Sequence, residues 1–156
     1  MSELSFRTPA FTHGESIPAK YTCEGEDVSP ELTVGNVPGD AAALAVVVDD
    51  PDAPAGTFTH WLLWNVPADT VELPEGVAAR EQVPDLGGAK QGENDFGDVG
   101  YRGPCPPEGE THEYRFTLYV LHEELDVDAG AVRTEVQDAL DGATDDSAQF
   151  TAIFGR

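Results

Sequence analysis

Cysteine, basic residues and long apolar runs are all scarce in this sequence. Its 156 residues include only two cysteines, Cys23 and Cys105, which are too few for a disulfide scaffold, and we expect both thiols to be reduced. No stretch approaches the roughly 20 apolar residues of a membrane-spanning helix. Residues 1–7 lack the features of a secretory signal. These absences predict a cytoplasmic protein without membrane insertion.

The shortage of basic residues leaves a strongly negative chain. Eight lysines and arginines face 30 aspartates and glutamates, which gives a formal net charge of −22. The acidic residues are dispersed among apolar runs, so they do not indicate a disordered tail. Such a surface suits molar salt, where the Debye length shrinks to roughly 3 Å and self-repulsion is screened. We therefore predict a halophilic protein that binds neither nucleic acid nor anionic membranes.

Apolar runs predict several strands. Residues 42–48 form a short, fully apolar run typical of a central buried strand, and residues 58–66 form the next run. The short link between these runs allows them to be antiparallel neighbours. Residues 113–121 alternate between apolar and polar, which is typical of a strand with one buried face. Weaker strand patterns cover residues 4–6, 32–34 and 150–154.

One helix is predicted before the last strand. Val132, Val136 and Leu140 recur every four residues, Asp128 can cap the helix and Gly142 can end it. No repeat, linker or low-complexity segment divides the chain. A chain of this length can bury about two-thirds of its unfolded surface. We therefore expect a single, mainly β domain spanning residues 1–156.

Two motifs place a proline-rich loop just before a histidine. The first is residues 49–54 (DDPDAP), followed by His60, and the second is residues 100–107 (GYRGPCPP), followed by His112. Proline fixes φ, so such loops lose little entropy when they hold a shape. We expect both histidines to lie at one shallow cavity. We also expect a cis peptide at Ala53–Pro54, in the tight bend before the strand.

The residues around these histidines favour an anion-binding pocket. Asp50 beside the His60 imidazole would fix its tautomer and raise its pKa. His112 and Tyr114 lie two residues apart and so share a strand face, while Gly103 allows close approach to the backbone. Two imidazoles, a phenol and loop N–H groups are the donors that phosphate, sulfate or carboxylate requires.

The same residues allow four other chemistries to be compared with anion binding. No serine lies in either motif and no G-x-S-x-G sequence occurs, which argues against a serine hydrolase. A metal site of His60, His112, an aspartate and Cys105 would lack the close ligand spacing of zinc sites. A Cys105 nucleophile paired with His112 shows no sign of an activated thiol. An acid–base enzyme using Asp50, His60 and His112 is the main enzymatic alternative.

The order of these motifs resembles the phosphatidylethanolamine-binding protein family, and most closely its bacterial and archaeal branch, called Raf kinase inhibitor-like. The resemblance rests on residues 50–54 (DPDAP), 60–65 (HWLLWN), 103–107 (GPCPP) and 112–114 (HEY), with support from residues 21–30 and 94–97. It implies an antiparallel β-sheet fold of the Greek-key sandwich type with one or two short helices. It also implies no established catalysis, and we expect neither a cofactor nor a metal. Eukaryotic relatives bind phospholipid headgroups or regulate kinases, and some members are reported as protease inhibitors.

Matched residue by residue, the family's ligand pocket falls on seven positions of this chain: Asp50, Asp52, His60, Gly103, Pro107, His112 and Tyr114. The family's arginine between the second histidine and the tyrosine is Glu113 here, and we expect its side chain to point away from the pocket. The predicted function is non-enzymatic binding of a small anionic or phosphorylated ligand. An inhibitor of a kinase or protease, and a small-molecule hydrolase, remain as alternatives. The sequence identifies no protein partner and leaves open whether the chain forms a homodimer.

Overall fold

The computed structural model describes residues 3–54 and 56–156, which form two antiparallel β-sheets and one α-helix. The small sheet has the strand order β1-β2-β5 and the large sheet the order β6-β7-β4-β3-β8-β9. The strands are β1 (Ser5–Arg7), β2 (Leu32–Gly35), β3 (Ala43–Asp50), β4 (Phe58–Pro67), β5 (Glu72–Leu73), β6 (Gln82–Val83), β7 (Ala89–Gln91), β8 (Thr111–Leu121) and β9 (Thr144–Gly155). The helices are α1 (Arg133–Ala143) and two short 3-10 helices, η1 (Ala19–Tyr21) and η2 (Pro84–Leu86). The mainly β, antiparallel fold predicted from the sequence is confirmed.

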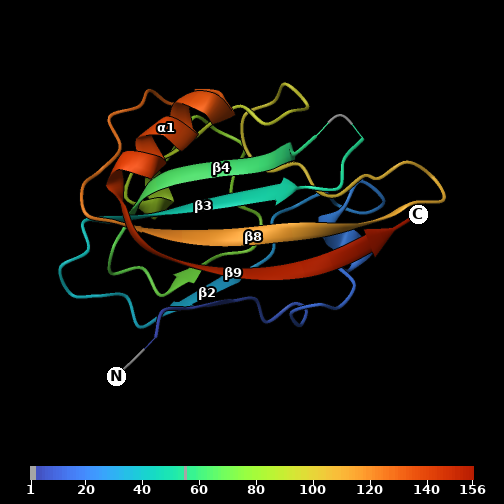
Figure 1. The fold of residues 1–156 in the computed structure, drawn as a ribbon, viewed down its shortest axis with the longest axis horizontal. Coiled ribbons are helices and arrows are strands. Elements are labelled where there is room, and N and C mark those ends of the chain that lie inside the picture. The colour runs from blue at the N-terminus through green and yellow to red at the C-terminus, as the bar shows by residue number, and fades with distance from the viewer. Residues whose placement is uncertain (1–2, 55) are drawn as a thin grey trace.

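The centre of the large sheet is β3, in agreement with its apolar run. All of its residues are buried, and it pairs with β4 on one side and β8 on the other. Figure 1 shows these three strands and β9 side by side. Both neighbours are antiparallel to β3, so the C-terminal end of β3 lies beside the N-terminal ends of β4 and β8. This end of the sheet therefore carries both predicted motifs.

Each face of the large sheet contributes to a separate core. On one face, Val46 and Phe116 pack with Leu32 of the small sheet. On the other face, Val47 packs with Leu140 of α1. Figure 1 shows α1 and β2 on opposite sides of the long strands. Successive residues of β3 and β8 thus point to different layers, as the alternation in residues 113–121 predicts.

The helix differs from its predicted ends. Val132 is the N-cap residue and no side chain caps the helix, so the prediction that Asp128 caps it is wrong. The helix runs through Gly142 and passes directly into β9, which begins well before the predicted residues 150–154. Val136 and Leu140 are buried as their spacing predicts, and their burial anchors the helix on the sheet. Within the two described ranges, no helix is both long enough and apolar enough to span a bilayer.

Candidate functional site

A cavity of about 190 Å³ lies where β3 ends and where β4 and β8 begin. Its walls are mostly apolar. The residues that line it are Asp50, Ala53, Pro54, Phe58, His60, Phe96, Cys105, Pro106, Pro107, His112 and Tyr114. The structure therefore brings five of the seven predicted site residues together at one cavity. The other two, Asp52 and Gly103, lie in the loops behind it and do not line it.

A β-bulge in β4 aims His60 at this cavity. Val48 of β3 is paired with Trp61, but the next residue, Asp49, is paired with Thr59, so His60 is an extra residue in β4. An extra residue of this kind interrupts the alternation of side chains along a strand. As a result, His60 and Trp61 both lie on the face toward the small sheet, with Trp61 in the core and His60 at the cavity.

His60 is buried and held in one tautomer. Its Nδ1 lies 2.8 Å from the carbonyl oxygen of Arg102, and a carbonyl can only accept, so Nδ1 carries the hydrogen. Only 3% of the residue is exposed. Burial lowers the pKa of His60, while the Arg102 carbonyl and the charge of Asp50 act in the opposite direction. The neutral ring therefore presents Nε2 as an acceptor, and it becomes a second donor only when it is protonated.

His112 is held between two carboxylates. Its Nδ1 lies 2.6 Å from Asp50 Oδ2 and its Nε2 lies 2.8 Å from Glu110 Oε1. The bond to Glu110 is the main reason that the pKa of His112 is raised, and the bond to Asp50 adds to it, while burial opposes both. Both ring nitrogens donate, so His112 is an imidazolium in this arrangement. The predicted partner of Asp50 was His60; Asp50 instead hydrogen bonds His112, although its charge also acts on His60.

Tyr114 lies beside both imidazoles and carries a hydroxyl without a partner. Its ring centroid lies 5.4 Å from that of His60 and 6.3 Å from that of His112. The side chain is fully buried, and its hydroxyl has no hydrogen-bond partner. Burial raises the pKa of Tyr114, and the charges of Asp50 and Asp52 raise it further, so the phenol remains protonated. A buried hydroxyl without a partner is costly, and a ligand in the cavity could supply one.

The aspartates of the first motif shape its loop. Asp50 Oδ1 accepts from the backbone N–H of Asp52 at 2.8 Å, and Asp52 Oδ2 accepts from the backbone N–H of Glu113 at 3.0 Å. Asp52 thus ties the first motif to β8 without reaching the cavity. The side chain of Glu113 is exposed and alternates with the inward-facing His112 and Tyr114, as expected.

The cis peptide predicted at Ala53–Pro54 is wrong, since no cis peptide occurs in residues 3–54 or 56–156. Gly56 N donates to Ala53 O at 3.0 Å, which closes a turn with Pro54 in its second position. Trans proline is favoured at that position, whereas cis proline belongs one residue later.

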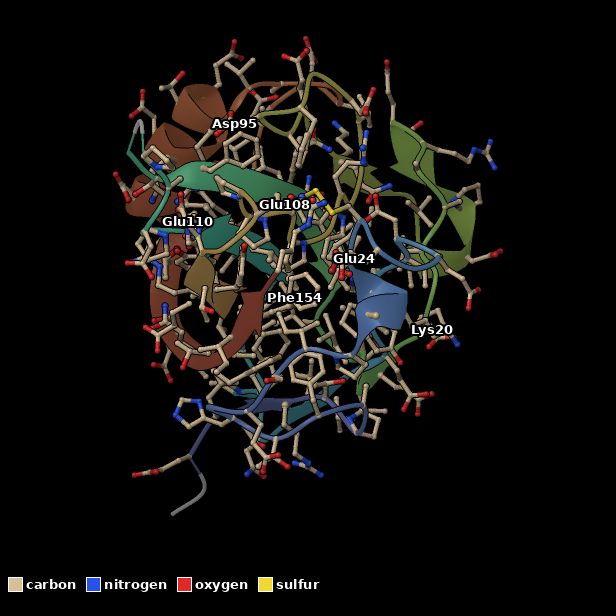
Figure 2. The ribbon with its side chains drawn as sticks, turned by 90° about the vertical axis from the view of Figure 1, so that its right-hand side faces the viewer. Lys20, Glu24, Asp95, Glu108, Glu110 and Phe154 are labelled. Carbon is tan, nitrogen blue, oxygen red and sulfur yellow. A yellow bond between two sulfur atoms is a disulfide. The ribbon has the colours of Figure 1, made fainter. Side chains whose placement is uncertain are left out.

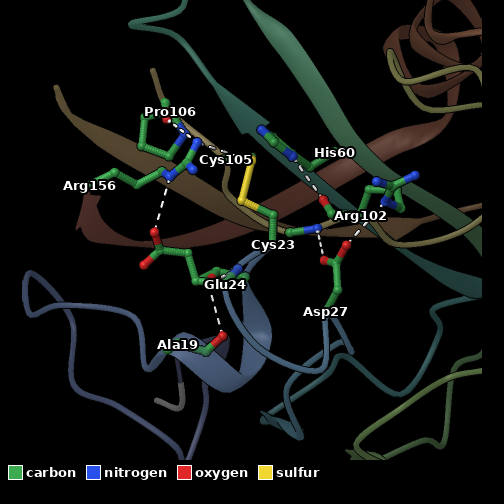
Figure 3. Close-up of a disulfide and its surroundings, with 11 residues drawn as sticks. Ala19, Cys23, Glu24, Asp27, His60, Arg102, Cys105, Pro106 and Arg156 are labelled. Atoms are coloured by element: carbon green, nitrogen blue, oxygen red, sulfur yellow. Dashed lines mark hydrogen bonds and ion pairs between the residues drawn. A yellow bond between two sulfur atoms is a disulfide. The ribbon is translucent and has the colours of Figure 1, made fainter. Parts of the chain in front are cut away.

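Gly103 is required for packing and not for contact with the cavity. A Cβ atom at Gly103 would lie 2.1 Å from the carbonyl oxygen of Tyr21. Its backbone N–H donates to Asp27 Oδ1 at 2.6 Å. Figure 3 shows Asp27 beside Arg102, whose carbonyl accepts from His60. The absence of a side chain at Gly103 therefore lets the second motif approach the segment after η1.

The two cysteines form a disulfide, which corrects the expectation of reduced thiols. Cys23 and Cys105 are joined across 82 residues with their Cα atoms 5.4 Å apart. Their distance along the chain suggested isolation, but Cys23 N also donates to Pro104 O, so the two loops lie in direct contact. Figure 3 shows Arg156 beside the bridge, where it donates to Pro106 O at 3.1 Å and to Glu24 at 3.1 Å. The disulfide and Arg156 together fix the loop that forms one wall of the cavity.

Sequence reasoning missed several residues at the cavity. Phe58 could have been found, because it lies two residues before His60 at the start of the same strand. Phe96 comes from a distant loop, where it packs on Phe58 with ring centroids 4.9 Å apart, and nothing in its sequence context indicates this. Glu110 was also missed, because its contact with His112 depends on the turn before β8.

The site offers binding groups more readily than catalytic ones. Cys105 is part of the disulfide, so it cannot act as the nucleophile considered above. Both nitrogens of His112 are engaged by carboxylates. The remaining polar groups are the Tyr114 hydroxyl, an acceptor on neutral His60 and the imidazolium charge. Together with apolar walls, these groups can hold a small polar or anionic head with an apolar substituent.

The sequence profile of the family described as phosphatidylethanolamine-binding protein matches residues 7–155 of this chain. A UPF0098 protein of Methanothermobacter thermautotrophicus is 43% identical over 153 residues, which cover 98% of this chain and 99% of that protein. A Mycobacterium tuberculosis protein named as a candidate lipoprotein, LppC, is 38% identical over 97% of this chain and 72% of its own length. The predicted cytoplasmic location therefore has no support from the names of these relatives.

A solved structure of a member of the same family matches this fold. Escherichia coli YbcL, described as a new member of the mammalian PEBP family, superposes with a TM-score of 0.92. It is 32% identical in sequence, and the match covers 99% of both chains. The agreement extends over both sheets, and so it includes the strand ends that carry the cavity.

Proposed function

Because the chain belongs to the phosphatidylethanolamine-binding protein family, we propose that it binds a small anionic or phosphorylated ligand in the cavity between His60, Tyr114 and His112, without catalysing a reaction. The observation that carries this proposal is the Tyr114 hydroxyl, which is buried and unpartnered on a ring that lies near both imidazoles. An oxygen atom of an oxyanion would accept from this hydroxyl and approach the positive charge of His112.

The walls of the cavity restrict the size and kind of ligand. A volume of about 190 Å³ admits a headgroup or a small ester. Phe58 and Phe96 supply an apolar side, and Phe96 is 39% exposed at the rim. A substituent on the anion would lie along these rings, because burying apolar surface is favourable. The proposed ligand therefore combines one oxyanion with a small apolar group, as phenyl phosphate does.

We do not propose a hydrolase, because the described residues that line the cavity include no serine and no free thiol. The proposed binding is tested by calorimetric titration with inorganic phosphate, phosphoethanolamine and phenyl phosphate in molar KCl. Tyr114→Phe removes only the hydroxyl and should weaken binding about tenfold, in the range for a hydrogen bond to a charged group. Tyr119→Phe, on the opposite face of β8, is the matched control and should bind as the wild type does. Equal affinity of the wild type and Tyr114→Phe would contradict the proposed site.

A further inference from the structure

Of the two ring N–H groups of His112, one is bound by the buried Asp50 and the other by Glu110, whose side chain extends to the surface. Nδ1 of His112 is engaged by Asp50, which is itself 3% exposed, so this bond belongs to the buried framework. Nε2 is engaged by Glu110 Oε1 at 2.8 Å. The Glu110 side chain is 48% exposed, so its carboxylate lies at the surface of the protein. The charge that would attract a ligand anion is therefore already paired with an anion of the chain itself.

The backbone of Glu110 is fixed independently of its side chain. Its N–H donates to Pro107 O at 3.1 Å, and its carbonyl accepts from Arg156 N at 3.2 Å. The carboxylate can therefore leave His112 by rotation of the side chain into solvent, while the loop keeps its shape. Figure 2 looks onto this end of the molecule and labels Glu110 and Glu108 on it.

We propose that Glu110 is an internal competitor for the anion site: its carboxylate holds the position on His112 Nε2 that a ligand oxyanion takes, and it must move away when the ligand binds. This inference rests on the proposed function and adds a specificity-determining residue to it. Each anion that binds His112 Nε2 must displace the Glu110 carboxylate, and this displacement lowers the affinity of the anion. A ligand that contacts only Tyr114 and His60 leaves Glu110 in place, so its affinity is not lowered.

The charged groups that face His112 are few, so the effect of Glu110 can be isolated. Asp50 faces the ring from β3 and Glu110 faces it from the turn before β8, while the neighbouring titratable groups are Tyr114 and His60. Removal of Glu110 leaves Asp50 as the single partner of the imidazolium. Measurements at pH 6, below the ordinary histidine pKa near 6.5, favour the protonated ring of His112, and the ¹⁵N signals of the His112 ring in each protein show whether the charge is kept.

The test compares Glu110→Ala with Glu108→Ala. Both changes remove one carboxylate from the same loop, and both residues precede β8, but only Glu110 contacts His112. Titration with phenyl phosphate at pH 6 in molar KCl should give a dissociation constant about tenfold lower for Glu110→Ala than for the wild type. Glu108→Ala should match the wild type. A ¹³C signal of the Glu110 carboxyl group in the wild type should also move toward its solvent value as ligand is added.

The outcomes separate the two proposals. Binding that is equal or weaker in Glu110→Ala overturns the competitor role and leaves the proposed function standing. Equal tightening in Glu110→Ala and Glu108→Ala also overturns it, because the effect would then be one of total charge. Absence of binding in the wild type and in both variants overturns the proposed function itself and the inference with it. Binding detected only in Glu110→Ala supports both.

Discussion

Asp49 and Asp50 are consecutive residues of β3, and their carboxylates act on opposite faces of the large sheet. Asp50 faces the cavity and accepts from His112, whereas Asp49 faces the layer of α1 and accepts from Arg115 and Arg133. Both are almost completely buried, at 3% and 4% exposure. One of them belongs to the candidate site, and the other secures the helix and the neighbouring strand.

Asp49→Asn should lower the free energy of unfolding more than it changes the affinity for a ligand. Arg115 binds Asp49 through two nitrogens, and Arg133 adds a bond from α1, so two guanidinium groups would lose their buried partner. Removing one member of a buried ionic cluster costs roughly 3–5 kcal/mol, and partial exposure of the arginines reduces this to about 2–3 kcal/mol. Urea denaturation in molar KCl measures the change. Asp138→Asn, exposed on α1, is the control and should change the free energy of unfolding by less than about 0.5 kcal/mol.

Tyr114→Phe should separate stability from binding. The hydroxyl is buried without a partner, so its removal should leave the free energy of unfolding unchanged or raise it by up to about 1 kcal/mol. Ligand affinity should fall in the same variant. Thermal unfolding with and without phenyl phosphate measures both effects. A loss of stability in the absence of ligand would mean that the hydroxyl has a partner inside the folded protein.

His60 and His112 should have opposite effects on how the free energy of unfolding depends on pH. The folded pKa of His112 is raised, so its contribution is complete below the unfolded pKa near 6.5 and is lost as pH rises through the folded pKa. The folded pKa of His60 is lowered, so the unfolded state takes up its proton first and stability falls as pH drops below about 6.5. Denaturation between pH 5 and 9 measures both limbs. His112→Gln should flatten the alkaline limb and His60→Gln the acidic limb; the reverse assignment would contradict these pKa directions.

The disulfide should contribute to stability and to the shape of the cavity wall. It closes a long loop, and bridges of this kind typically contribute about 2–4 kcal/mol. The double variant Cys23→Ala, Cys105→Ala should therefore melt at a lower temperature than the oxidised wild type. Adding reductant should lower the melting temperature of the wild type but not that of the double variant. Two free thiols in protein denatured without reductant would show that the bridge does not form in solution.

The melting temperature should depend on salt. The chain carries a formal charge of −22, and Figure 2 shows oxygen-tipped side chains around the outline of the molecule. Lowering KCl from molar to about 0.01 M extends the Debye length to roughly 30 Å, so the carboxylates repel one another over longer distances. Circular dichroism should show a fall in melting temperature across this series. A constant melting temperature would argue against adaptation to high salt.

The strands could be predicted because their patterns are local. The apolar run of β3 and the alternation in β8 indicate which residues are buried, and antiparallel pairing then brings His60 and His112 to the same end of the sheet. Their position at the same end of the sheet follows from these patterns, but their meeting at one cavity also requires the β-bulge that turns His60 toward it. The helix cap was not predictable in the same way, because Asp128 is held in a turn that ends before α1 begins.

The missed features depend on contacts between distant segments. The pairing of Cys23 with Cys105 requires the segment after η1 to pack on the second motif, and no local pattern records that packing. The choice of His112 over His60 as the partner of Asp50 depends on register at the ends of three strands. Sequence therefore identifies the members of the site more readily than the bonds between them.

The extra residue in β4 makes the site separable from the fold by a single deletion. A chain without His60 could restore uninterrupted pairing between Thr59 and Trp61 and the residues of β3, and Trp61 would keep its place in the core. Such a chain would retain the sandwich and lose one imidazole from the cavity. Deletion of His60 would therefore remove both the imidazole and the bulge that presents it, whereas a substitution at His60 would change the side chain and keep the bulge.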